Sequence, residues 1–229
     1  MVEKVKRLVE ELMKNDDSGH GIDHIDRVLD LAMSFAEKQD CNKELVALGA
    51  LLHDVDDYKL FGNENQEQLT NTNRILNQIG ADETTKNAVL EIVASIGYSK
   101  RLKGITPQTI EGMIVSDADM CDAIGVNALL RTHIYTLKHD KKFFDKDLWP
   151  IENMCAEKYT RKCADSSVCH IFEKCLKLKN LMFTEAGQKE AIERHNFTVR
   201  FLRQLFKEEK AYDWEIYLDK YLEELRWNI

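Results

Sequence analysis

The helical spacing of apolar residues is the feature that most restricts the fold of this chain. Apolar side chains recur at intervals of three and four residues in one segment after another, which is the period of an amphipathic α-helix. The 229 residues include only two prolines and ten glycines, so few positions interrupt a helix or favour a turn-rich β architecture. The pattern therefore predicts an all-α protein, built as a helical bundle.

The predicted helices are separated by short polar segments or by glycine. They cover residues 2–14, 21–38, 44–57, 66–79, 83–96, 109–138, 169–182, 186–208 and 214–228. Residues 109–138 fit either one long helix or two abutting ones. Segments 61–66 and 98–107 are expected to be loops, the second of them basic, and residues 139–168 form the least regular part.

The sequence indicates a single domain over residues 1–229. It contains no internal repeat, no low-complexity segment and no linker rich in glycine or serine. Apolar residues make up 44% of the chain, which is enough for a full hydrophobic core. We expect the core of the domain over about residues 15–205 and a C-terminal helical extension over residues 206–229.

Charge and hydropathy limit the partners of the protein. The formal net charge of −8 argues against general binding to nucleic acid or to a membrane surface. No apolar run approaches the roughly 20 residues of a membrane span, and the N-terminus lacks the features of a signal peptide. The six cysteines show no C-x-x-C spacing, which disfavours a structural zinc site. We expect a cytoplasmic protein without a nucleic-acid or membrane partner, and the sequence leaves the oligomeric state open.

Two histidines and a carboxylate fall on apolar helix faces. His24 shares a face of segment 21–38 with Leu31 and Phe35. His53 and Asp54 lie in the stretch GALLHDVDDYKLFG, in phase with its apolar face. A lone histidine there could be a hydrogen-bonded core residue, but a buried carboxylate is costly unless it is paired, hydrogen-bonded or bound to a metal. Their convergence inside a helical bundle predicts a metal site.

Other acidic positions provide a comparison and a further ligand. The pair His139–Asp140 lies among lysines without an apolar frame and is expected to be solvated surface. Asp117, Asp119 and Asp122 instead interrupt the apolar stretch IVSDADMCDAIG, which suggests that at least one of them points at a cation. Asp119 is in phase with Val115 and is the best inward candidate.

Three motifs occur in order, GHGIDHIDRV, ALLHDVDDYK and VSDADMCDAIG. They resemble the motifs of the HD-domain superfamily of metal-dependent phosphohydrolases, and more narrowly its small single-domain hydrolases. GHGID and Cys121 depart from the usual pattern without touching a proposed ligand. The resemblance implies a bundle with a metal site between helices. It also implies the ligands His24, His53, Asp54 and Asp119.

Two imidazoles and two carboxylates suit one divalent transition metal, with Mn²⁺ first and Fe²⁺, Co²⁺, Ni²⁺ or Zn²⁺ also suitable. Such an ion polarises a phosphoryl oxygen and lowers the pKa of bound water. Binuclear HD phosphodiesterases and HD nucleases add histidines between the His-Asp pair and the last aspartate. Residues 55–118 contain no histidine, which argues for one ion per chain.

Asp57 is the candidate catalytic residue. It shares the face of His53 and Asp54 if the helix continues past them, and the resemblance also puts a catalytic carboxylate there. We expect Asp57 to orient or deprotonate the attacking water, and its neighbour Asp56, out of phase, to face solvent. Without the family, a surface aspartate at a helix end is an equally good interpretation of Asp57.

Several basic side chains are candidates for contacts with a substrate phosphate, because a phosphate needs several donors and positive charge. They are His20, Arg27, Lys59, Arg131, His170 and Lys174. Each of them alone could equally be solvated surface. His133 and His195 lack such a context and are expected to be structural or surface residues.

The sequence thus predicts a metal-dependent phosphohydrolase acting on a small phosphorylated molecule, with a nucleotide as the favoured substrate. One alternative is a guanosine-polyphosphate alarmone hydrolase, although the surrounding motifs match the small hydrolases better. Another is a non-catalytic regulatory protein that binds a metal or a nucleotide. Asp57 together with Lys59 favours catalysis, because a pure binder has no use for a carboxylate that orients water. Four inward-facing polar residues disfavour a helical scaffold.

Overall fold

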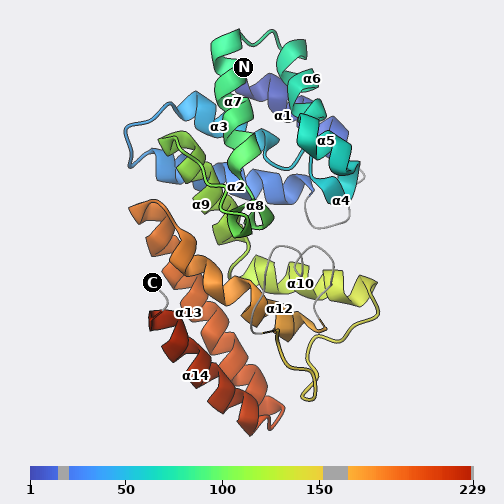
Figure 1. The fold of residues 1–229 in the computed structure, drawn as a ribbon, viewed down its shortest axis with the longest axis vertical. Helices are drawn as coiled ribbons and strands as arrows, with labels where there is room; N and C mark the ends of the chain where they lie inside the picture. The colour runs from blue at the N-terminus through green and yellow to red at the C-terminus, as the bar shows by residue number, and fades with distance from the viewer. Residues whose placement is uncertain (15–20, 152–164, 228–229) are drawn as a thin grey trace. The chain divides into compact units, whose positions relative to one another are not determined.

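The computed structural model describes residues 1–14, 21–151 and 165–227, and within these ranges all regular elements are helices. The prediction of an all-α protein is confirmed. The chain divides into two compact units, Met1–Asp122 and Ala123–Ile229 (Figure 1). The single domain over residues 1–229 stays a prediction.

The first unit contains the helices that carry the three motifs. They are α1 (Val2–Met13), α2 (Ile22–Ala36), α3 (Lys43–Leu52), α4 (Tyr58–Phe61), α5 (Asn63–Gln68), α6 (Thr70–Gln78), α7 (Glu83–Ser95), α8 (Tyr98–Leu102) and α9 (Ile110–Asp122). Helix α3 is the most buried, since all residues from Val46 to Leu52 are buried, and it contacts α1, α2, α7 and α9. Helix α2 also contacts α9. Helices α2 and α9 therefore pack directly on each other and on α3, whose C-terminus leads into His53 and Asp54.

Local sequence explains how α3 is placed. The side chain of Asn42 accepts hydrogen bonds from the backbone N–H groups of Glu44 and Leu45, which caps the N-terminus of the helix. At Gly49, a Cβ atom would lie 2.8 Å from a methyl carbon of Ile92 on α7. The missing side chain thus lets α3 and α7 approach closely.

Three sequence expectations about local structure are wrong. The helix expected over 44–57 ends at Leu52, because the chain beyond it forms tighter turns, such as the hydrogen bond from Val55 N–H to the Leu52 carbonyl. The expected loop 61–66 contains most of α5, which starts after Gly62 at a positive φ of 86°. The expected loop 98–107 begins with α8, which starts after Gly97 at a φ of 119°. Short polar helices of this kind lack the apolar stripe that identifies a helix from sequence.

The second unit contains α10 (Val126–Lys138), α12 (Ser167–Glu173), the 3₁₀ helix η1 (Cys175–Leu181), α13 (Glu185–Glu208) and α14 (Tyr212–Trp227). Residues 109–138 thus form two helices, which is one of the two possibilities left open. The helix expected over 169–182 changes to a 3₁₀ helix, since Lys174 leaves the helical conformation.

Aromatic side chains form the core of the second unit. Phe172, Phe206 and Trp214 are fully buried and contact one another, and Trp149 stacks on Trp214 with ring centroids 4.4 Å apart. The segment expected as a C-terminal extension therefore contributes α14 to this core. None of the helices in the described residues combines the length and the hydropathy needed to span a bilayer.

Candidate metal centre

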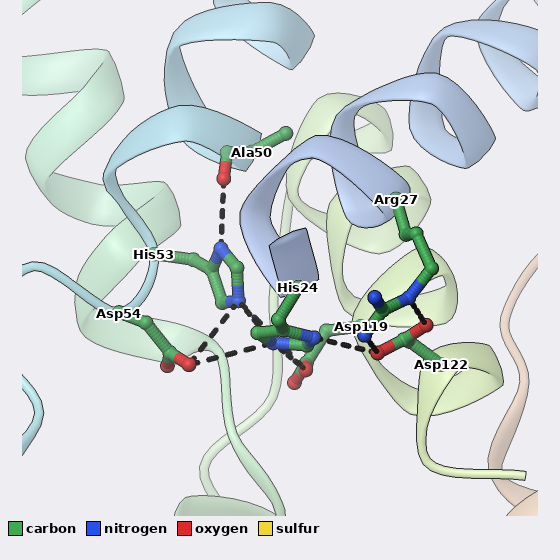
Figure 2. Close-up of polar contacts among 7 residues, drawn as sticks. All are labelled: His24, Arg27, Ala50, His53, Asp54, Asp119 and Asp122. Carbon is green, nitrogen blue, oxygen red and sulfur yellow. Dashed lines mark hydrogen bonds and ion pairs between the residues drawn. The ribbon is translucent and has the colours of Figure 1, made fainter. Parts of the chain in front are cut away.

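His24 lies in the first turn of α2, and its ring is held from one side. Its Nδ1 atom lies 2.7 Å from Oδ2 of Asp122 on α9, and only 2% of the residue is exposed (Figure 2). Arg27, one turn further along α2, donates to both oxygens of the same carboxylate, from Nε at 2.8 Å and from Nη2 at 3.0 Å. A carboxylate paired with a guanidinium is ionised and only accepts, so the proton belongs on Nδ1 of His24. The Nε2 lone pair is then available to a metal.

The ring of His53 is oriented by a different partner. It caps the C-terminus of α3, and its Nδ1 atom donates to the Ala50 carbonyl at 2.7 Å. A carbonyl cannot donate, so in the neutral ring the Nε2 atom of His53 also carries a lone pair. The two Nε2 atoms lie 3.2 Å apart. Two lone pairs at this separation repel each other unless a cation lies between them.

Two carboxylates complete the cluster (Figure 2). Oδ2 of Asp54 lies 3.4 Å from Nε2 of His24 and 3.6 Å from Nε2 of His53. Oδ1 of Asp119 lies 3.5 Å and 3.8 Å from the same two atoms. The structure therefore brings together all four residues that the resemblance names, from α2, from α9 and from the turn after α3.

The spacing of these atoms fits a small divalent cation. Metal–ligand bonds of about 2.0–2.2 Å put neighbouring ligand atoms roughly 2.8–3.6 Å apart, and the distances above run from 3.2 to 3.8 Å. The ligand atoms of His24, His53 and Asp119 all lie within 4.8 Å of one another, and those of His24, His53 and Asp54 lie within 3.6 Å of one another. Two imidazoles and two carboxylates are a donor set for a divalent transition metal.

The electrostatics of Asp119 also favour cation binding. Burial raises the pKa of its carboxyl, but the imidazoles of His24 and His53, in their protonated forms, lower it by more. The pKa of Asp119 is therefore below its ordinary value. The side chain is 21% exposed, against 2% for His24. Asp119 is thus an ionised carboxylate with access from outside the core.

Asp122 was one of three candidate aspartates in the sequence, but its contact with His24 and Arg27 was not predicted. Its side chain is 1% exposed and contacts both His24 and Arg27. Through the Nδ1 atom of His24 it orients the ring of this predicted ligand. The signal in the sequence is its spacing of three from Asp119, which puts both carboxylates on one face of α9. The guanidinium of Arg27 is engaged by Asp122, and this hydrogen bond raises the pKa of Arg27. A contact between Arg27 and phosphate stays a prediction.

The expectation that Asp56 faces solvent is wrong. Asp56 is 2% exposed, and its carboxylate accepts from the backbone N–H of Asn71 at 2.7 Å and of Thr72 at 2.9 Å. The hydroxyl of Thr72 donates to it as well, at 2.7 Å. These N–H groups belong to the first turn of α6 and have no acceptor inside that helix. Asp56 therefore caps α6 and fixes it to the turn that carries His53 and Asp54.

Asp57 lies at the start of α4 rather than on α3. Its N–H donates to the Asp54 carbonyl at 3.1 Å, and its own carbonyl accepts from Leu60 and Phe61. The helical phase that relates Asp57 to His53 does not apply, because α3 ends before both residues. Asp57 is half-buried and three residues from a ligand. Its catalytic role stays a prediction.

Lys100 is a residue that the sequence expectations missed, because it lies in the segment expected to be a basic loop. The side chain is half-buried, and Nζ donates to the Val93 carbonyl at 2.9 Å. Burial lowers the pKa of Lys100, while the charges of Asp54, Asp57 and Asp56 act in the opposite direction. A cation thus lies in the field of the aspartates around the predicted metal site. No periodicity in the sequence marks this position.

The remaining predicted phosphate contacts lie elsewhere in the chain. His20 and the side chain of Lys59 fall outside the described residues. Arg131 lies on α10, His170 on α12 and Lys174 directly after α12, all in the second unit. Their roles stay predictions.

Three further histidines can be placed. His139 is exposed, which confirms that the second His-Asp pair is solvated. His195 is a buried structural residue, and His133 packs edge-on against the ring of Phe143.

Comparisons with known proteins point to one family. The family model described as "HD domain" matches residues 21–124, a range that contains all four predicted ligands. The YpgQ protein of Bacillus subtilis (strain 168) is 29% identical over 217 residues, which is 93% of this chain and 96% of YpgQ.

Solved structures agree. The crystal structure of an HD-superfamily hydrolase from Bacillus thuringiensis matches with a TM-score of 0.70 and 30% identity, over 92% of this chain and 97% of that one. A protein from Lactobacillus plantarum matches over the same shares with a TM-score of 0.80 and 29% identity. A crystal structure of YpgQ in complex with ADP matches with a TM-score of 0.67 and 27% identity, over 91% of this chain and 97% of that one. With the ligand cluster in place, these likenesses show that the chain belongs to the HD-domain superfamily.

Proposed function

We propose that this protein hydrolyses a phosphoester or phosphoanhydride bond in a small phosphorylated molecule, with a nucleotide as the favoured substrate. The observation that carries the proposal is the convergence of two Nε2 lone pairs, fixed by Asp122 and Ala50, with two carboxylates. His24, His53, Asp54 and Asp119 would hold one divalent transition metal, with Mn²⁺ first. When bound, such an ion supplies positive charge that polarises a phosphoryl oxygen and acidifies water.

The protein's own residues have separable tasks in this proposal. Asp122 and the Ala50 carbonyl keep the two imidazoles neutral and correctly turned. Asp56 fixes the ligand-bearing turn to α6. Asp57 accepts a proton from the water that attacks phosphorus, while the bond from phosphorus to the leaving oxygen breaks. The leaving oxygen carries away the bonding electron pair and is protonated by solvent.

The relatives support the choice of substrate class. The B. thuringiensis relative is named a hydrolase, and YpgQ has a crystal structure in complex with ADP. ADP combines a phosphoanhydride bond with a phosphoester bond, so it fits both parts of the proposal. The same complex also fits the second candidate function, a regulatory protein that binds a nucleotide without turnover.

The deciding experiment is a hydrolysis panel. Protein stripped of metal and reconstituted with one of Mn²⁺, Fe²⁺, Co²⁺, Ni²⁺ or Zn²⁺ is offered nucleoside mono-, di- and triphosphates, guanosine polyphosphates and simple phosphate esters. We expect metal-dependent release of phosphate or pyrophosphate from a nucleotide, with Mn²⁺ giving the highest rate. No hydrolysis with any of the five metals would reject the enzyme. Nucleotide binding in that case would favour the regulatory protein.

A further inference from the structure

The position of Lys100 is fixed by rigid parts of the first unit. The ammonium donates to the carbonyl of Val93, in the last turn of α7, and α7 packs against both α3 and α9. Its neighbour Tyr98 is 8% exposed and anchors α8, the short helix that follows α7 in Figure 1. Lys100 is therefore held on helices that also position the predicted ligands His53 and Asp119.

The charge of Lys100 acts on the acidic cluster without being paired to it. Asp54, Asp57 and Asp56 all influence its proton affinity, with Asp54 strongest. Yet among the residues that the structure describes, Lys100 forms no ion pair, and its hydrogen bond goes to a neutral carbonyl. An ammonium carries three N–H donors, so two remain beyond the one on Val93.

This arrangement is costly for a purely structural lysine. Partial burial removes water from an ammonium group and disfavours its charged form, unless an anion compensates. A lysine that served only to neutralise the aspartates would gain most from a direct ion pair with one of them. A cation that feels the charge of Asp54, and that has two donors without an acceptor among the described residues, is instead suited to an oxyanion that arrives with the ligand.

The charge balance of the centre favours such a cation. Two ionised carboxylates and two neutral imidazoles cancel the charge of one divalent ion. A phosphate group with two negative charges would then enter a site with no net positive charge from the metal and its ligands. Arg27 supplies little positive charge for a phosphate, because its guanidinium is paired with Asp122. Lys100 supplies a positive charge that is not paired with a ligand carboxylate.

We propose that Lys100 is a substrate-binding residue that donates to a phosphate oxygen beside the metal centre formed by His24, His53, Asp54 and Asp119. This assignment rests on the proposed function for its substrate class. The assignment extends the proposed function, because Lys100 lies outside the three motifs of the sequence.

The test measures ADP and Mn²⁺ affinity separately by calorimetry. Lys100→Met removes the charge and all donors, whereas Lys100→Gln keeps one N–H group for the Val93 carbonyl. Lys103→Met is the matched control, because Lys103 is exposed and three residues along the chain. We expect both Lys100 variants to bind ADP about tenfold to a hundredfold more weakly in the presence of Mn²⁺. Lys100→Arg should retain most of the affinity, and Lys103→Met all of it.

The Mn²⁺ affinity separates substrate binding from support of the metal site. Loss of a nearby positive charge should leave Mn²⁺ affinity unchanged or raise it. Unchanged ADP affinity in Lys100→Gln would overturn the assignment. So would a fall in Mn²⁺ affinity that accounts for the loss of ADP binding, since Lys100 would then only position the ligands. Wild-type protein that binds neither ADP nor inorganic pyrophosphate in the presence of Mn²⁺ overturns it too.

The two proposals fail in different ways. If wild-type protein binds ADP through Lys100 but hydrolyses nothing in the panel, the assignment of Lys100 stands and the proposed hydrolase fails. If wild-type protein hydrolyses a nucleotide and both Lys100 variants keep its KM, the hydrolase stands and the assignment of Lys100 fails.

Discussion

The two His-Asp pairs of this chain share their local geometry and differ in their surroundings. His53 and His139 each cap the C-terminus of a helix, and each ring hydrogen-bonds through Nδ1 to a backbone carbonyl of the preceding turn. The acceptors are Ala50 at 2.7 Å and Tyr135 at 2.8 Å. His53 is buried and its Nε2 atom faces that of His24, whereas His139 is exposed.

The difference shows that the dipeptide and its backbone conformation do not make the site. The hydrogen bond that prepares a histidine for metal binding occurs at both pairs. What distinguishes His53 is the arrival of His24 and Asp119 from helices that pack against α3. Metal binding is thus a property of long-range packing. Variants at the two pairs should separate the contribution of this packing from that of the local His-Asp geometry.

The largest expected effect is at the ligands. His53→Ala and Asp119→Ala each remove a donor from the centre, so neither variant should bind Mn²⁺ stoichiometrically or show turnover. His139→Ala, which removes the same kind of histidine from the other pair, should bind and react as the wild type does. Metal analysis after dialysis, with circular dichroism as the check of folding, reads out the comparison. Full metal occupancy in both ligand variants would reject the site.

The next effect is at Asp57. Asp57→Asn keeps the size of the side chain but cannot accept a proton from water. We expect turnover to fall about 10²- to 10⁴-fold, which is about 3–5 kcal/mol of transition-state stabilisation. Mn²⁺ and ADP affinity should change little, because Asp57 is not a proposed ligand. Wild-type turnover in this variant would make Asp57 a structural or surface residue.

A smaller effect on Mn²⁺ affinity is expected at Asp122, which hydrogen-bonds to the predicted ligand His24. Asp122→Asn leaves Arg27 and His24 without an ionised acceptor, so His24 loses the partner that fixes its tautomer. Mn²⁺ affinity should fall about 10- to 100-fold. Asp30→Asn, at an exposed position of the same helix as His24, should leave it unchanged. Equal Mn²⁺ affinity in both variants would show that Asp122 does not support the ligand.

The second unit contains a histidine whose effect is on stability rather than on metal binding. Burial lowers the pKa of His195 to about 4, helped by the charge of Lys179 and opposed by a hydrogen bond with the Leu176 backbone. Its Nδ1 atom is buried and has no hydrogen-bond partner among the described residues. Below pH 6.5 the unfolded chain therefore binds more protons at this residue than the folded chain does, and stability falls as the pH falls toward 4.

Urea unfolding at pH 7 and pH 5 tests this effect. When the pH is lowered from 7 to 5, His195 should reduce the free energy of unfolding of the wild type by about 2 kcal/mol. His195→Leu should lose that part of the pH dependence, whereas His139→Leu at the exposed histidine should retain it. The same pH dependence in all three proteins would contradict the role of burial.

The sequence was most informative where an apolar stripe frames a polar residue. His24, His53, Asp54 and Asp119 follow from the stripes and the resemblance, and the structure brings them together. Asp56 was misplaced because α3 ends at Leu52, and helical phase has no meaning beyond the end of a helix. Lys100 was missed because its setting depends on the packing of α7 and on Gly97, and neither can be read from a five-residue polar helix.

The number of metal ions bound per chain tests the central claim most directly. Residues 55–118 contain no histidine, and the described residues hold one cluster of suitable ligand atoms. Titration of metal-free protein with Mn²⁺ should therefore reach one tightly bound ion per chain, with turnover rising in proportion to that ion. Two tightly bound ions per chain, both of them required for turnover, would contradict the single-metal centre proposed for His24, His53, Asp54 and Asp119.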